Sequence, residues 1–170
     1  DMRMDQSSGL TAADIVNTWT KDDLVELFKT YGEIRKPRRV VEKICDKRKQ
    51  KPFEKTTELA ETIASVDGWS KKGRHPATKY FLALRVVTNN EIDFLRNAMI
   101  QLVQHLNPKG RLLVITFHST EDRIVKWTFK EIEEYGKPLF KKVIKPTREE
   151  EMKNPRSRSA KLRVFERSEK

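Results

Sequence analysis

Cysteine is almost absent from this sequence of 170 residues. The single Cys45 cannot form a disulfide within one chain, and it cannot build a cysteine-based metal site. No apolar run approaches the roughly 20 residues of a membrane span, and no signal peptide opens the chain. These absences favour a cytoplasmic protein in a reducing compartment, with no membrane partner.

Glycine is scarce as well. The six glycines are scattered, and none belongs to a P-loop or to a G-x-G-x-x-G dinucleotide motif. His75, His105 and His118 lie far apart in the sequence, with no cysteine or carboxylate at ligand spacing, so we expect no metal site. The G-x-S-x-G elbow of many hydrolases is missing too.

Negative charge is in the minority. The 36 lysines and arginines outnumber 25 aspartates and glutamates, which gives a formal net charge of +11. This excess favours a polyanionic partner, nucleic acid first and an anionic membrane surface second, with a merely basic protein as the alternative. The cations are densest over residues 35–51, where their number suits phosphate contacts but is also typical of a solvated helix face.

The first half of the chain is predicted to be helical. Apolar spacing indicates helices at about 11–19, 20–32 and 37–49, a short one capped by Thr56 or Thr57, and a region over 77–106 that is continuous or broken near 88–90. Thr20 is a good N-cap, with Asp23 placed for a capping box. Gly32 is expected to end that helix as a C′ glycine.

The second half is predicted to be α/β. Four consecutive aliphatic residues at 112–115, between turn signals, predict a strand buried on both faces. Ser119 is expected to cap the next helix, with Asp122 at its third position. Further strands are expected at 139–144 and 162–165. The histidine and serine that follow the first strand also make half of a hydrolase arrangement, although capping is the favoured use of Ser119.

Two groups of side chains suggest binding chemistry. In open α/β sheets ligands bind at the carboxyl ends of strands, so the first candidates are His118, Ser119, Asp122 and Arg123. His75 leads a helix whose N-terminus would attract a phosphate. The tryptophans could stack on bases or fill the core, and they are Trp19, Trp69 and Trp127.

Five ordered motifs identify a family resemblance. They are DMRMD at 1–5, YGE at 31–33, RHPATK at 74–79 with ALR at 83–85 and NNE at 89–91, FHSTEDRIVK at 117–126, and NPRSRSAKLR at 154–163. In this order they resemble the bacterial 16S ribosomal RNA (cytosine-N4)-methyltransferase family over nearly the whole chain.

The resemblance implies the C-terminal portion of a class I, Rossmann-like methyltransferase sheet with an inserted all-helical domain. Residues 1–10 would be a loop from the missing cofactor half, 11–72 the helical domain for RNA or substrate recognition, and 73–170 the C-terminal part of the α/β domain. Within that part, 111–117 resembles the fifth strand, and 139–144 with 161–166 resembles the antiparallel pair at the sheet edge.

The departures from the family concern the cofactor. In the family the glycine-rich cofactor loop, the acidic ribose ligand and the fourth strand all precede DMRMD, and none is in this chain. S-adenosylmethionine is therefore implied as the cofactor, while no cofactor-binding residue is expected here and the chain alone should have negligible affinity for it. Smaller departures are Pro37, Thr120 and a short 66–74 loop. We expect the missing N-terminal half or another chain to pair with the outer edge of strand 111–117.

The resemblance also suggests site residues, most of them around one pocket, with Arg156, Arg158 and Lys161 on the rRNA backbone instead. Those expected to be catalytic are Asp5, His118 and Ser119. Those expected to bind substrate are Arg3, His75, Thr78, Arg85, Asn89, Arg156, Arg158 and Lys161. Structural roles are the alternatives: an ion pair of Asp122 with Arg123, a link between Arg85 and Glu91, and ordering of a hairpin by 154–161.

The function implied is S-adenosylmethionine-dependent methylation of the N4 amine of a cytidine in the decoding centre of 16S rRNA, with the small ribosomal subunit as partner. The alternative is a non-catalytic RNA-binding remnant or ribosome assembly factor.

Overall fold

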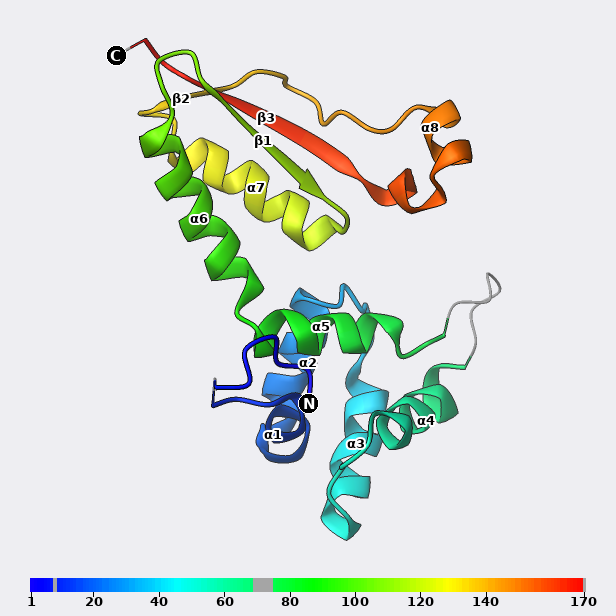
Figure 1. Cartoon of the computed structure of the whole chain (residues 1–170). Helices are drawn as coiled ribbons and strands as arrows, with labels where there is room; N and C mark the ends of the chain where they lie inside the picture. Colours follow the sequence, from blue (N-terminus) through cyan, green and yellow to red (C-terminus); the bar gives the residue numbers. More distant parts are fainter. Residues whose placement is uncertain (8, 69–74, 170) are drawn as a thin grey trace. The chain divides into compact units, whose positions relative to one another are not determined.

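The protein forms two compact units, Asp1–Glu91 and Ile92–Lys170, called here the helical unit and the sheet unit. A computed structural model describes residues 1–7, 9–68 and 75–169 (Figure 1). Helices and a three-stranded sheet make it a mixed α/β protein, as predicted. The units divide at 91/92, whereas the resemblance places a domain boundary at 72/73, which stays a prediction.

The helical unit contains five helices in the described part of the chain. They are α1 (Ala12–Thr18), α2 (Lys21–Thr30), α3 (Arg38–Gln50), α4 (Thr56–Asp67) and α5 (Thr78–Thr88). The capping box of Thr20 with Asp23 is confirmed. The prediction that a threonine caps α4 is wrong: Lys55 takes that position, and its N–H donates to the Glu58 carboxylate.

The end of α2 differs in detail from the prediction. Gly32 does follow the helix, but the left-handed backbone conformation falls on Glu33, with φ of 49°. Glycine is still required at position 32, because a Cβ there would lie 2.8 Å from the carbonyl oxygen of Phe28. Close approach of the backbone, and not a positive φ, therefore explains this glycine.

Apolar side chains from all five helices form the core of the helical unit. Phe28 of α2 meets Tyr80 of α5 edge to face, with ring centroids 4.8 Å apart. The Tyr80 hydroxyl donates to Asp67, and burial together with this carboxylate raises the pKa of Tyr80. Trp19 packs against the same core. Of the two alternatives for this tryptophan, base stacking and core packing, the structure therefore has core packing.

A break separates α5 from α6 (Glu91–His105), as one of the two sequence alternatives predicts. Asn90 has a left-handed φ of 48°, which stops the helix, and α6 starts at the next residue. Asn is one of the residues that tolerate this conformation best. The break places Asn89 at the end of α5, where its side chain is available for other contacts.

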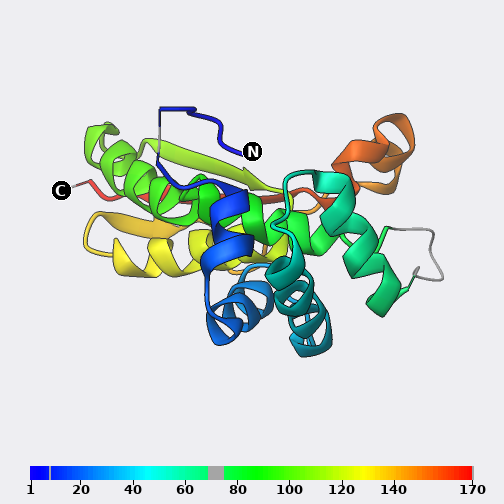
Figure 2. The same ribbon diagram turned by 90° about the horizontal axis from the view of Figure 1, so that it is seen from below.

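The sheet unit packs two helices on one face of an antiparallel sheet (Figure 2). Its remaining elements are β1 (Arg111–Thr116), α7 (Ser119–Glu131), β2 (Gly136–Pro138), α8 (Arg148–Lys153), the 3-10 helix η1 (Pro155–Ser159) and β3 (Lys161–Arg167). The strand order is β1-β3-β2. Met99 and Val103 of α6 join Val125 and Phe129 of α7 over Phe165 of β3.

The expected burial of β1 on both faces is wrong. Leu113 and Ile115 are 59% and 60% exposed, whereas Leu112 and Val114 pack on the core side. Only one face of the strand is covered by helices, so the alternate residues project into solvent. Within the described ranges β1 pairs with β3 alone and forms an edge of the sheet. A four-residue aliphatic run reveals the strand but not what covers it.

The prediction of a strand at 139–144 is also wrong. The strand that forms is the short β2, which ends before this range and pairs with β3 through Pro138 opposite Phe165. The chain then follows β3 loosely: the N–H of Leu139 donates to Val164, and Ile144 forms an isolated bridge with Leu162. Pro138 lacks an N–H, which shortens the ladder. The last strand is confirmed as β3.

Among the described residues, none of the helices combines the length and apolar character needed to span a membrane.

Candidate functional site

In the helical unit, the N-terminal segment is held against the end of α5 by Asn89. The N–H of Met4 donates to Asn89 Oδ1 at 2.6 Å, and Asn89 Nδ2 donates to the carbonyl of Met2 at 3.0 Å. Both bonds flank Arg3, whose guanidinium pairs with Asp1. Three of the predicted site positions, Arg3, Asp5 and Asn89, are thus brought close together by backbone contacts.

Arg85 stands one helical turn before Asn89 and forms a two-pronged ion pair with Glu91. Its Nε and Nη2 atoms donate to the two carboxylate oxygens at 2.6 and 2.9 Å. The pair is half-buried and joins the end of α5 to the start of α6. The structural alternative for Arg85 is therefore present, and the substrate-binding role stays a prediction.

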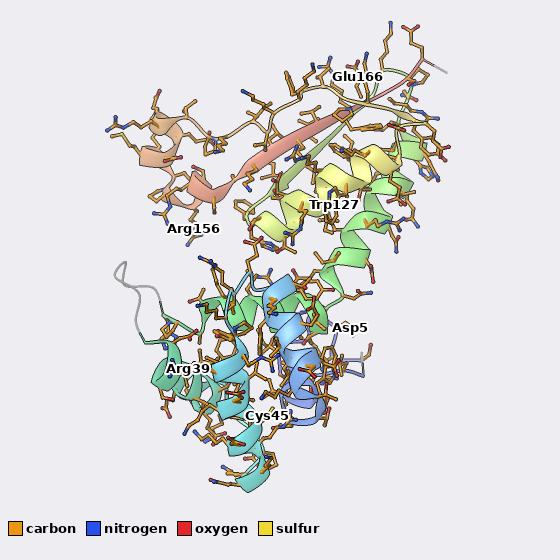
Figure 3. All side chains as sticks on the ribbon, turned by 180° about the vertical axis from the view of Figure 1, so that it is seen from behind. Asp5, Arg39, Cys45, Trp127, Arg156 and Glu166 are labelled. Carbon is orange, nitrogen blue, oxygen red and sulfur yellow. The ribbon has the colours of Figure 1, made fainter. Side chains whose placement is uncertain are left out.

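Asp5 is a solvent-exposed carboxylate with a local anchor. Ser7 donates both its hydroxyl, at 2.6 Å, and its backbone N–H, at 2.9 Å, to Oδ1 of Asp5. Figure 3 labels Asp5. These two bonds lower the pKa of Asp5 below the ordinary value. A carboxylate of this kind stays ionised and can only accept hydrogen bonds.

His75 and Thr78 lie at the opposite end of α5 from Arg85 and Asn89. The Thr78 hydroxyl donates to the carbonyl of His75 at 2.8 Å, and His75 Nδ1 accepts the N–H of Ala77 at 3.1 Å. At 1.5 Å per residue, Thr78 lies roughly 10 Å from Arg85 and roughly 16 Å from Asn89 along the helix axis. Binding of one cytidine by all four residues stays a prediction. Arg74 and Trp69, which accompany them in the sequence, lie outside the described residues.

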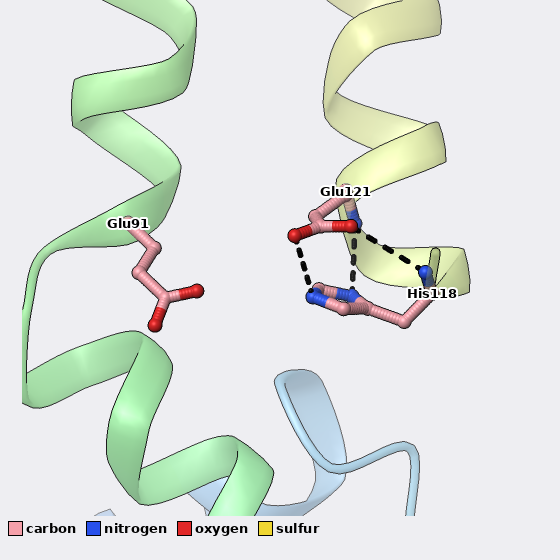
Figure 4. Close-up of side chains that lie close together, drawn as sticks. All are labelled: Glu91, His118 and Glu121. Atoms are coloured by element: carbon pink, nitrogen blue, oxygen red, sulfur yellow. Dashed lines mark hydrogen bonds and ion pairs between the residues drawn. The ribbon is translucent and has the colours of Figure 1, made fainter. Parts of the chain in front are cut away.

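In the sheet unit, polar side chains gather where β1 ends and α7 begins. His118, not Ser119, is the N-cap: its Nδ1 accepts the N–H of Glu121 at 3.3 Å. In return, the Glu121 carboxylate accepts the N–H of His118 (Figure 4) and also the N–H of Phe117. The prediction that Ser119 caps the helix is wrong. The spacing His-x-x-Glu, which resembles a capping box, was the signal for this arrangement.

The imidazole and carboxylate also face each other directly. His118 Nε2 lies 2.9 Å from Glu121 Oε1, a contact that becomes an ion pair when the imidazole is protonated. Burial raises the pKa of Glu121, but the hydrogen bonds from His118 and Phe117 outweigh it, so this pKa lies below its ordinary value. The carboxylate is thus held ionised next to the imidazole.

Asp122 links α7 to β3. It is the fourth helical residue rather than the predicted third, because α7 begins at Ser119. Its carboxylate accepts from Arg163 Nε at 2.7 Å and from Lys161 Nζ at 3.3 Å. Burial raises the Asp122 pKa, and the two cations more than offset this, so that it ends below the ordinary value. Lys161, expected to bind rRNA, therefore already has a carboxylate partner.

Replacing Asp122 by asparagine is expected to lower the free energy of unfolding by about 2 kcal/mol, because charge-assisted bonds to two half-buried cations are lost. Urea unfolding measures the difference. The contribution is present above the unfolded pKa of about 3.9 and is lost as the pH falls through the lower folded value. The asparagine variant and the parent should therefore converge in acid, and a gap that persists there would contradict the ion-pair origin.

The loop before β3 presents two arginines. Asn154 accepts the N–H of Arg156, and the buried Ser157 donates its hydroxyl to the Asn154 carbonyl at 2.8 Å. Arg156 and Arg158 on either side of Ser157 are exposed (Figure 3), and neither forms an ion pair within the described chain. The loop is therefore ordered by its own hydrogen bonds, and its two arginines are still exposed to solvent.

The turn from β1 to α7 does not fit S-adenosylmethionine. It contains Phe117 and His118 but no glycine, and its N–H groups are already taken by Glu121. A cofactor seat at a strand end needs close backbone approach and free donors. Phe117 and His118 supply neither.

The predicted pocket shared by His75 and His118 joins residues of the two units, and it stays a prediction. The sheet unit by itself brings together His118, Ser119 and Lys161, because Lys161 pairs with Thr116 at the end of β1.

An α/β fold with polar groups at a strand end is the arrangement of ligand-binding α/β proteins, and the excess of positive charge favours nucleic acid as the ligand. The chain belongs to the MraW methylase family, which matches residues 1–168. This confirms the family resemblance given by the sequence motifs.

Several relatives carry the name "Ribosomal RNA small subunit methyltransferase H". The protein of Bdellovibrio bacteriovorus is 55% identical over 99% of this chain and 51% of its own length. Those of Rippkaea orientalis and Coprothermobacter proteolyticus are each 48% identical, over 98% and 97% of this chain and 54% and 56% of their own lengths. The chain spans about half the length of the relatives it matches.

Proposed function

We propose that this chain is the substrate-holding part of an enzyme that methylates the N4 amine of a cytidine in the decoding centre of 16S rRNA, with S-adenosylmethionine bound by polypeptide outside it. The observation that carries the proposal is the 55% identity, over 99% of the chain, to a relative named as a small-subunit rRNA methyltransferase. The turn between β1 and α7 offers no cofactor seat, which is consistent with a donor site elsewhere.

Polar groups of this chain would orient the cytidine. An exocyclic amine is a weak nucleophile, so the protein has to orient it and accept its hydrogen bonds. Asp5, kept ionised by Ser7, is suited to accept from the amine. His118 and Ser119 lie at the strand end, where a base can approach the sheet.

The helical unit would contact rRNA phosphates through α3. Several of its cations are engaged: Arg38 pairs with Asp22 and Lys49 with Asp46. Arg39, marked in Figure 3, and Lys43 are exposed and form no ion pair within the described residues. They lie four residues apart and therefore share one side of the helix.

The loop arginines give a first measurable prediction for RNA binding. Replacing both Arg156 and Arg158 by alanine should reduce the slope of log affinity against log salt by about 1.4, because each phosphate contact contributes about 0.7 on single strands. Fluorescence anisotropy with single-stranded 16S rRNA fragments measures this slope. Lys109→Ala with Lys153→Ala is a charge-matched control, since both lysines already pair with glutamates. Equal slopes for the two double variants would show that the loop is not part of the RNA interface.

The second candidate is a non-catalytic RNA-binding or assembly role, which needs only exposed cations such as Arg156 and Arg158 and no methyl donor. A fusion protein distinguishes the two roles. In it, the N-terminal half of the Bdellovibrio protein is joined to the start of this chain. The fusion protein should transfer labelled methyl groups to small ribosomal subunits, while the chain alone should not. A folded fusion that binds S-adenosylmethionine but transfers nothing would favour the non-catalytic role.

A further inference from the structure

A groove in the sheet unit lies apart from the strand-end groups. It has a volume of about 240 Å³ and runs between α7 and the chain that follows β2. The lining residues are Lys126, Phe129, Lys130, Pro138, Phe140, Lys141, Arg163 and Val164. This volume is below the range of roughly 300–1,000 Å³ typical of small-molecule pockets. It therefore suits one flat group better than a whole cofactor.

The groove is strongly positive. Its lining contains no acidic residue, and within the described ranges Lys126, Lys130 and Lys141 are exposed and form no ion pair. The charge of Arg163, by contrast, is balanced by Asp122. Three unbalanced ammonium groups around one groove attract an anion with several charges spaced along it.

An aromatic ring stands among these cations. Phe140 is 49% exposed, whereas Phe129 beside it is buried and packs on Phe165. Phe129 therefore supports the fold, while much of the Phe140 ring contacts water. Aromatic rings beside a positively charged track are the usual means of binding single-stranded nucleic acid, because bases stack on the ring while lysines contact the phosphates.

We propose that this groove binds an unpaired segment of RNA, with a base stacked on Phe140 and phosphates on Lys126, Lys130 and Lys141. The choice of RNA over an acidic peptide rests on the proposed function and on the ring, since a carboxylate-rich peptide needs only the cations. In a duplex the bases are stacked on each other and unavailable to Phe140, so the groove is specific for unpaired RNA.

The test uses the full chain and a labelled oligouridylate of roughly 12 nucleotides, within the site sizes of single-strand binders. Phe140→Ala should weaken binding about 5- to 150-fold, the range for loss of one stacked base. Phe140→Trp should restore the affinity, and its fluorescence should be quenched on binding. Neither substitution should change the affinity for a duplex of equal length.

The lysines are tested through salt. The triple variant Lys126→Gln, Lys130→Gln, Lys141→Gln should reduce the salt slope by about 2, from 0.7 per contact on a single strand. The matched control is Lys51→Gln, Lys109→Gln, Lys153→Gln, whose lysines pair with Glu58, Glu169 and Glu149 outside the groove. This control changes the net charge equally and should alter the slope far less.

Three results would overturn the proposal. If the parent chain shows no salt-dependent RNA binding, the groove and the proposed rRNA substrate both fail. If the parent binds but Phe140→Ala and the lysine variant behave like the controls, only the groove fails. If Phe140→Ala weakens duplex and single strand equally, the ring does not stack on an unpaired base.

Discussion

Replacing Asp5 by asparagine in the fusion protein is expected to lower kcat for methyl transfer by about a hundredfold, the cost of removing one group that stabilises a transition state. The Asp5 carboxylate is held ionised by two hydrogen bonds from Ser7 and can accept from the cytidine amine as it loses electron density. Asparagine keeps the shape but presents a neutral oxygen or an NH₂ group.

Steady-state kinetics on small ribosomal subunits measure this effect. KM for S-adenosylmethionine should be unchanged, because an interaction made only in the transition state alters kcat alone. Asp93→Asn, an exposed aspartate on α6, is the control with the same change of charge. Equal rates for the two variants would exclude Asp5 from the chemistry and restrict it to anchoring the N-terminal segment.

Replacing Ile115 by aspartate is expected to have opposite consequences in the two forms of the protein. In the chain alone Ile115 is 60% exposed, so the change should stay within about 0.5 kcal/mol. In the fusion protein the added polypeptide is expected to cover this face of β1, and an unpaired buried carboxylate costs about 3 kcal/mol or more.

Urea unfolding of both forms gives the comparison. Met152→Asp on α8 is the matched control: it also replaces an exposed apolar residue, with 75% of its surface in water. It should be nearly neutral in both forms. An Ile115→Asp fusion as stable as the Met152→Asp fusion would mean that the open face of β1 remains uncovered.

Local chemistry explains what could be predicted from the sequence. Thr20 and Asp23 sit at capping-box spacing, so the start of α2 needed no tertiary information. The helix break was predictable from the Asn89-Asn90 pair for the same reason. The one-sided burial of β1 was not predictable, because Leu113 and Ile115 are as apolar as Leu112 and Val114, and only the fold decides which face is covered.

The cap of α7 shows a different limit. Serine is a strong intrinsic N-cap, so the sequence predicts a cap at Ser119. In the structure Glu121 decides the matter, because its carboxylate reaches back to the N–H groups of Phe117 and His118 and fixes the cap one residue earlier. Phe140 and its lysines were missed because the sequence predicts a strand at 139–144, whereas a loop forms there and lines a groove with α7.

Some contacts of the predicted site residues could be anticipated from the sequence, and others could not. Arg3 and Asn89 are far apart in sequence yet meet through the backbone of Met2 and Met4, a contact that only the motif resemblance hinted at. Thr78 and Asn89 lie at opposite ends of α5, and the length of that helix keeps them apart. Whether His75 approaches His118 depends on two separate units and stays a prediction.

The most direct test of the central claim is the identity of the methylated nucleoside. Unmodified small ribosomal subunits treated with the fusion protein and S-adenosylmethionine are digested to nucleosides and analysed by mass spectrometry. N4-methylcytidine from 16S rRNA is the result expected if this chain presents a cytidine amine to the methyl donor. Methyl groups on another atom, or none from a folded fusion that binds the donor, would contradict it.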